Sequence, residues 1–307
     1  MNLSVELAPR NKSGLKLKNP VMAASGTFGY GTEDSYLFDI QKLGAVVCKG
    51  TTIKPREGNP QPRIVETEGG LLNSIGLENI GIESLIRDKA PVWADLEVPF
   101  IVNIAGETVR DYAELAQRLD SIVGVSALEV NISCPNVRAG GAEFGSNPEG
   151  AAEVTRAVRA ATSLPVLVKL TPNTEDIVKI ALAAEKAGAD ALTLINTLKG
   201  MAIDVNTRKP LLGNIFGGLS GPAIKPVALG MVYEVAGEVG IPLIGCGGIM
   251  TATDALEFIM AGASAIQIGS ANLSNPRAPL DVLEGIEYFM EKEGIEDLAK
   301  LVGIARV

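Results

Sequence analysis

The segment 242–271, PLIGCGGIMTATDALEFIMAGASAIQIGSA, contains the repeating unit that decides the fold. It begins with a short aliphatic run at 242–248, continues through a helix-length amphipathic segment, and ends with a second aliphatic run at 265–271. Two strands separated by a helix predict a parallel pair, because a parallel connection needs a crossover. Thr251 offers a capping hydroxyl where the helix starts, and Gly262 offers the left-handed conformation that ends it.

The same unit recurs along the chain. Six further aliphatic runs come before it, at 20–26 (PVMAASG), 45–52 (AVVCKGTT), 99–106 (PFIVNIAG), 127–134 (ALEVNISC), 165–172 (PVLVKLTP) and 191–197 (ALTLINT). Eight strands that alternate with helices predict an α/β fold, a closed (β/α)8 TIM barrel. Barrels of this length form one domain, so we expect residues 1–307 to be a single domain. The opening segment 3–17 is expected to form a short hairpin beneath the barrel.

Other helix ends follow the same pattern. Gly44 and Gly188 each precede an alanine at the start of a strand, where a left-handed glycine would end the preceding helix. Thr108 and Thr174 precede acidic residues, as Thr251 does, which predicts a capped helix start at each place.

Three connections after strands are too long to be plain turns. They are 52–78 after the second strand, 135–147 after the fourth and 198–221 after the sixth. In a (β/α)8 barrel the loops after strands lie on the catalytic face. The sequence therefore predicts that these three loops surround an active site.

Composition and charge exclude several classes of protein. The formal net charge of -9 gives no electrostatic reason to bind nucleic acid. The N-terminus lacks the apolar core of a signal peptide, and no stretch stays apolar long enough to span a bilayer. We expect a cytoplasmic protein that binds neither nucleic acid nor membrane.

The reactive residues are few. The chain has no histidine, which removes Ser-His-Asp chemistry and the usual zinc sites, so no metal site is expected. Cys48, Cys134 and Cys246 are far apart and form no Cys-x-x-Cys pair. Neither a disulfide framework nor a four-thiolate cluster is expected on this chain, so any iron-sulfur cluster belongs to another subunit.

Polar residues recur where the predicted strands end. They are Ser25, Lys49, Asn103, Asn131, Cys134, Lys169, Asn196 and Thr197. Strands buried in a barrel are normally aliphatic, so polar groups repeated at this level predict a site. The alternative, that each one satisfies loop backbone, suits one or two of them but not eight.

Cys134 is the candidate base. It ends the fourth strand beside polar neighbours, and the glycine-rich loop that follows could close over it. The alternative is a small buried hydrophobe, the usual role of a free cysteine, and we assign that role to Cys48 and Cys246.

Glycines after the last two strands predict a phosphate site. Gly247 and Gly248 follow the seventh strand, and Gly269 and Ser270 follow the eighth, where barrel enzymes commonly bind phosphate through backbone N–H groups. Lys49 and Lys169 end strands at the mouth, where a lysine needs an anion or an electron-rich ring. For Lys169 a salt bridge to Glu129 is the alternative.

Across nearly its whole length the chain resembles the class 1 dihydroorotate dehydrogenases. The similar segments are NPVMAASGTFG at 19–29, CKGTTIKPREGNPQPR at 48–63, LLNSIGLENIG at 71–81, NISCPNV at 131–137, VKLTPN at 168–173, INTLKG at 195–200, GGLSGPAIKPVAL at 217–229 and GCGGI at 245–249. The resemblance implies oxidation of dihydroorotate to orotate in pyrimidine biosynthesis.

The resemblance also implies a cofactor and the residues that bind it. FMN is implied, with matching positions at Ser25, Lys49, Gly50, Asn103, Asn131, Lys169, Ile195, Gly221, Gly247, Gly248, Gly269 and Ser270. The substrate positions are Lys49, Asn73, Ser74, Ile75, Gly76, Leu77, Asn131, Asn196 and Thr197. Cys134 matches the catalytic base, which removes the C5 proton while Lys49 holds the substrate carboxylate.

Within that class the chain is more similar to the NAD-linked branch than to the fumarate-linked one. The segments NVRAGGAEFG at 136–145 and GGLSGPAIKP at 217–226 carry this likeness. It implies a partner subunit with FAD and a [2Fe-2S] cluster, in a heterotetramer with two of each subunit.

Three alternatives remain at this point. A fumarate-linked enzyme of the same class would use a different electron acceptor. A Schiff-base lyase on the same fold would use Lys169 or Lys49 as its nucleophile. A non-enzymatic phosphate-binding barrel would leave the cluster of Asn, Lys and Cys residues unexplained.

Overall fold

The computed structural model describes residues 1–33, 38–132 and 144–307. Eight parallel strands close into a barrel, as the sequence predicted, with β16 pairing back onto β3. The strands are, in order around the barrel, β3 (Val21–Ala23), β4 (Ala45–Val47), β7 (Phe100–Ile104), β8 (Ala127–Asn131), β9 (Val166–Lys169), β10 (Ala191–Leu194), β15 (Leu243–Cys246) and β16 (Ala265–Ile268).

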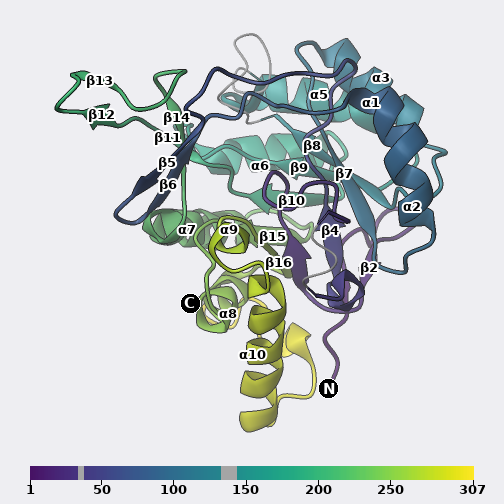
Figure 1. Ribbon diagram of the computed structural model, residues 1–307. Coiled ribbons are helices and arrows are strands. Elements are labelled where there is room, and N and C mark those ends of the chain that lie inside the picture. The colour runs from purple at the N-terminus through teal and green to yellow at the C-terminus, as the bar shows by residue number, and fades with distance from the viewer. Residues whose placement is uncertain (34–37, 133–143) are drawn as a thin grey trace.

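Helices surround the strands (Figure 1). They are α1 (Gly81–Ser84), a π-helical segment (Leu85–Lys89), α2 (Ala90–Ala94), α3 (Val109–Leu119), α5 (Pro148–Ala161), α6 (Ile177–Lys186), α7 (Lys225–Ala236), α8 (Ala252–Ala261), α9 (Ala271–Ser274) and α10 (Ala278–Lys292). Short 3-10 turns cover Ile40–Lys42, Pro222–Ile224 and Leu298–Lys300. Among the described residues, no helix combines the length and apolarity that a bilayer crossing requires.

Two of the three predicted helix caps are confirmed. Thr108 and Thr251 each form a capping box, with an aspartate three residues later, at the starts of α3 and α8. The prediction for Thr174 was wrong, because α6 begins after Asp176, whose side chain accepts a hydrogen bond from the Lys179 N–H. The Thr174 hydroxyl instead accepts from the Asp176 N–H and shapes the turn before the cap.

Two of the three glycines behave as predicted. Gly188 (φ 105°) and Gly262 (φ 126°) have the positive φ that an L-residue avoids. Gly44 does not, so its predicted left-handed conformation was wrong. It is needed instead for close packing, because a Cβ at this position would lie 2.1 Å from the Asn19 carbonyl oxygen.

Asp254 allows a stability prediction. Burial raises the pKa of this carboxyl, but Lys225, the Thr251 hydroxyl and two backbone N–H groups lower it more, so the pKa falls below its usual 3.8. A carboxyl whose pKa is lower in the folded protein than in the unfolded chain stabilises the fold at pH values above its unfolded pKa. This stabilisation is lost as the pH falls through the pKa of the folded state. Asp254→Asn should therefore cost about 1 kcal/mol at neutral pH, measured by urea unfolding, and less in acid.

A control for this prediction is Asp111→Asn, which alters the matching capping box of α3. Asp111 has no ion pair among the described residues, so its replacement should cost less than that of Asp254. Equal costs, or a cost at Asp254 that grows in acid, would contradict the account.

The N-terminal hairpin closes the bottom of the barrel, as predicted. Strands β1 (Val5–Glu6) and β2 (Lys16–Leu17) pair antiparallel, and Leu7, Ala8, Leu15 and Leu17 pack against side chains inside the barrel. Met22, Val47, Ile101, Leu167 and Ile244 belong to that apolar interior cluster. The lower half of the barrel is thus a packed core, so polar chemistry is confined to the upper half.

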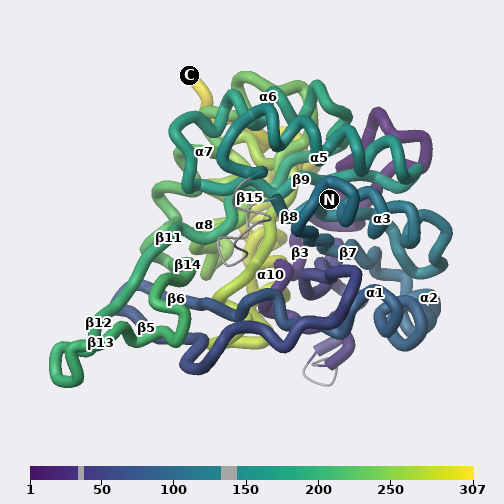
Figure 2. Tube along the Cα trace, turned by 90° about the horizontal axis from the view of Figure 1, so that it is seen from above, coloured from purple at the N-terminus to yellow at the C-terminus, as the bar shows by residue number. Residues whose placement is uncertain are grey.

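Two of the predicted long loops join in one sheet beside the mouth. Strands β5 (Ile64–Thr67) and β6 (Gly70–Asn73) come from the loop after β4, while β11 (Leu198–Gly200) and β14 (Gly217–Ser220) come from the loop after β10. Their order is β11-β14-β6-β5. A further hairpin, β12 (Ile203–Asp204) and β13 (Lys209–Pro210), projects away from the barrel (Figures 1 and 2). Of the predicted loop at 135–147, residues 135–143 lie outside the described residues.

Candidate active site

The polar residues at the strand ends converge on one cavity of about 310 Å³. Ser25, Lys49, Asn103, Asn131, Lys169, Asn196 and Thr197 all line it. They follow or end strands that are far apart in the sequence, and the closed barrel brings them to one face. Cys134, the eighth member of the predicted set, lies outside the described residues.

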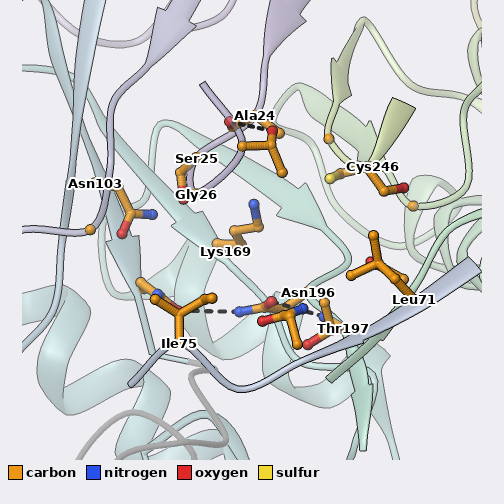
Figure 3. A pocket seen from close by; sticks show the side chains of 18 of the residues that line it. Ala24, Ser25, Gly26, Leu71, Ile75, Asn103, Lys169, Asn196, Thr197 and Cys246 are labelled. Carbon is orange, nitrogen blue, oxygen red and sulfur yellow. Dashed lines mark hydrogen bonds between the residues drawn. The ribbon is translucent and has the colours of Figure 1, made fainter. Parts of the chain in front are cut away.

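A buried polar layer lies directly beneath the cavity. Lys169 Nζ is 3.8 Å from Glu129 Oε1, so the salt bridge considered as an alternative for this lysine is present. Lys169 Nζ also donates a hydrogen bond to Gln267 Oε1 at 3.3 Å. Lys169 nevertheless lines the cavity, between Asn103 and Cys246 in Figure 3. The salt bridge and the position at the site are therefore compatible.

The positive charge of Lys169 is stabilised by Glu129. Burial lowers the pKa of its ammonium, but the Glu129 carboxylate more than compensates, so the pKa lies above its usual 10.5. Burial also raises the pKa of the nearby Cys246 thiol. The floor of the cavity thus carries a fixed positive charge beside a neutral thiol.

Lys49 is the other cation at the mouth. It lines the cavity and, within the described ranges, forms no ion pair. A lysine in such a place is suited to an anionic ligand.

The predicted phosphate glycines lie together. Gly247, Gly248, Gly269 and Ser270 line the cavity, and the first two have φ values of 130° and 72°. Gly221, which the resemblance adds to this set, is not among the lining residues. It lies behind them, because its carbonyl oxygen would be 2.8 Å from a Cβ placed on Gly248.

The segment 73–77 forms one wall of the cavity. Asn73, Ile75, Gly76 and Leu77 line it, whereas Ser74 is fully buried behind them. Asn59 supports this wall: its backbone N–H donates to the Ile75 carbonyl at 3.0 Å, and its side chain donates to the Ser74 hydroxyl at 3.0 Å.

Three predicted substrate positions are joined directly. Asn196 Nδ2 donates to Asn131 Oδ1 at 3.3 Å. Asn196 Oδ1 accepts from the Thr197 N–H at 2.8 Å, and these two residues lie side by side in Figure 3. Both amides are therefore held in fixed orientations at the mouth.

Sequence reasoning missed several lining residues. Apolar ones dominate: Ile64, Leu71, Ile224, Ile249 and Leu273, together with Thr27, Glu78, Ser220 and Cys246. Cys48 is a buried hydrophobe, as predicted, and Cys246 is also buried but lines the cavity. Alternation could have indicated this, since Cys246 is two residues after the interior Ile244.

A (β/α)8 barrel whose strand ends bring glycines, amides and lysines to one cavity is typical of barrel enzymes. The family model for dihydroorotate dehydrogenase matches residues 8–290. The chain therefore belongs to the dihydroorotate dehydrogenase family.

Individual relatives agree with this assignment. One from Geotalea daltonii is 54% identical over 306 residues, which covers 100% of this chain and 99% of the relative. One from Trichlorobacter lovleyi is 57% identical over 301 residues, with coverages of 98% and 97%. One from Desulforamulus reducens is 55% identical over 307 residues, with coverages of 100% and 99%. Each is named dihydroorotate dehydrogenase B (NAD(+)), catalytic subunit.

The resemblance stated from the sequence is thus confirmed, including its preference for the NAD-linked branch. The predicted class of activity, a dihydroorotate dehydrogenase and hence an oxidoreductase, is confirmed at the level of the family.

Proposed function

We propose that this chain oxidises (S)-dihydroorotate to orotate with FMN as the hydride acceptor, and that a second subunit passes the electrons to NAD. The observation that carries the proposal is the convergence, in one cavity, of the glycines after β15 and β16, the buried Lys169 and the amides of Asn73, Asn103, Asn131 and Asn196.

The residues present fit FMN. Backbone N–H groups at Gly247, Gly248, Gly269 and Ser270 would hold the phosphate. Lys169 would face the flavin ring, where its fixed charge would favour the negative charge that the ring gains on accepting a hydride. Asn103 Oδ1 is buried and has no hydrogen-bond partner among the described residues, which suits a polar ring edge rather than an empty space.

When bound, FMN supplies the acceptor for the hydride that leaves C6 of the substrate. Lys49 would hold the substrate carboxylate at the mouth. Asparagines suit a cyclic ureide, because each amide offers both a donor and an acceptor. Cys134, as its thiolate, would take the C5 proton, a role that stays a prediction from the sequence.

The lyase alternative is disfavoured by the surroundings of Lys169. A Schiff-base lysine needs a depressed pKa so that its amine is neutral. The Glu129 carboxylate has the opposite effect and holds the pKa of Lys169 above its usual value.

The proposal includes a partner, a second subunit that passes the electrons to NAD. The relatives are named as catalytic subunits, which implies a second subunit. We propose that it carries FAD and a [2Fe-2S] cluster, with two copies of each subunit, because this sequence has no separate glycine-rich dinucleotide unit and no cluster motif. The cytoplasmic location stays a prediction.

Reconstitution tests the proposal. The purified chain should bind one FMN, transfer electrons from dihydroorotate to an artificial dye, and reduce NAD only after the electron-transfer subunit is added. Retention of FAD, or rapid NAD reduction by this chain alone, would overturn it. Efficient turnover with fumarate alone would place the chain in the fumarate-linked branch.

A further inference from the structure

Glu129 is a fully buried carboxylate in the layer beneath the cavity, on β8 two residues before Asn131. Its Oε1 accepts from Asn103 Nδ2 at 2.8 Å, and its Oε2 accepts from Thr193 Oγ1 at 3.0 Å and from Gln267 Nε2 at 2.6 Å. Three neutral donors from three other strands therefore point at this one side chain. A buried carboxylate is costly, and its salt bridge to Lys169, whose Nζ lies 3.8 Å from Oε1, accounts for its charge but not for the three neutral donors.

The bond to Glu129 decides which way the Asn103 amide faces. Because Nδ2 is directed at the carboxylate, Oδ1 is turned to the other side, beside Gly50, another residue that lines the cavity. A Cβ on Gly50 would lie 3.0 Å from that oxygen. Oδ1 is buried and unpaired within the described part of the chain, so it is matched to a donor on a bound molecule.

The other amide in the network cannot turn in the same way. Gln267 Oε1 accepts from Lys169 Nζ, so turning Gln267 would direct its NH2 group at the ammonium. Among the residues that the structure describes, Asn103 has no such second bond, because its oxygen is the unpaired atom. Its orientation therefore depends on Glu129 presenting an acceptor rather than a donor.

We propose that Glu129 is a positioning residue that acts through Asn103: it holds the amide with its oxygen toward the cavity and so selects a ring edge that presents an N–H group there. The inference rests on the proposed function, since the oxidised isoalloxazine ring of FMN carries its only N–H in the imide at N3. An amide turned the other way would direct N–H against N–H at this edge.

Glu129→Gln tests the inference with almost no change in shape, and it also removes the negative charge beside Lys169, which the double variant below restores to the network. The substituted side chain has an acceptor oxygen on one side and a donor NH2 group on the other. Either Asn103 or Gln267 would then face that NH2 group with its own, so one of these two amides must turn. Asn103 is the one that can. FMN binding to the apoprotein, followed by quenching of flavin fluorescence, should weaken by about tenfold or more. Thr193→Val is the matched control: it removes a donor to the same carboxylate without turning Asn103, and should change FMN affinity by less than about threefold.

A second substitution should rescue the first. In Glu129→Gln combined with Asn103→Asp, the carboxylate at 103 accepts from the new amide and still offers an oxygen to the cavity. The net charge is unchanged, and FMN affinity should return to within about threefold of the parent. Asn103→Asp alone places two carboxylates in contact and should bind FMN poorly. If Glu129→Gln does not fold, the double variant should still bind FMN more tightly than Asn103→Asp.

Each outcome decides one claim. Unchanged affinity in Glu129→Gln, or a double variant no better than either single one, would overturn the role of Glu129 and leave the proposed function in place. A lower melting temperature of the apoprotein without a change in FMN affinity would assign Glu129 to stability alone, and so would also overturn it. Failure of the parent protein to bind FMN would instead overturn the proposed function.

Discussion

Cys134→Ala should retain FMN but lose nearly all reduction of the flavin by dihydroorotate. General base catalysis contributes about 10²- to 10⁴-fold, and the chain has no histidine to replace the thiolate. Anaerobic stopped-flow absorbance measures the rate. A free thiol has a pKa of about 8.5, and only its thiolate accepts a proton, so the rate in the parent should increase with pH through that ionisation.

Cys134→Ser is the matched control, since a hydroxyl is a far weaker acid than a thiol. It should remain active only at higher pH. A Cys134→Ala variant that reduces its flavin at the parent rate would show that another group acts as the base.

Lys49→Ala should raise the KM for dihydroorotate by about 10²-fold or more, because it removes the cation expected to pair with the substrate carboxylate. Lys49 lines the cavity and has no ion pair within the described ranges, so its charge is available to a ligand. The melting temperature should change little by comparison. Steady-state kinetics with an artificial dye as acceptor gives the KM and the kcat.

Lys54→Ala is the control, since Lys54 is exposed, five residues away along the chain, and is not among the residues that line the cavity. Its KM should match the parent. A Lys49→Ala enzyme with the parent KM would remove Lys49 from the substrate site.

The barrel and most of its mouth could be predicted because the signals are local. Each strand is a short aliphatic run, and a polar residue at its end is visible in the same run, as at Asn103 and Lys169. Closure into a barrel then places all the strand ends on one face, whatever their separation in the sequence. This is why seven of the eight polar positions could be placed in one cavity from the sequence.

The remaining features depend on contacts between distant segments. The pairing of β6 with β14 joins residues about 145 positions apart, and neither loop shows an alternation strong enough to predict it. The network around Glu129, with Lys169 included, needs the register of five strands, so period-two alternation could show only that Glu129 and Asn131 share a face. Gly44 looked like a helix end, but its role depends on the approach of Asn19.

The visible spectrum of the FMN-loaded chain under anaerobic conditions, recorded before and after dihydroorotate is added, tests the central claim most directly. Bleaching of the flavin band by a stoichiometric amount of dihydroorotate, with orotate formed in equal quantity, is the result that we predict. A flavin spectrum that stays unchanged with excess dihydroorotate would contradict the assignment of both cofactor and substrate to this cavity.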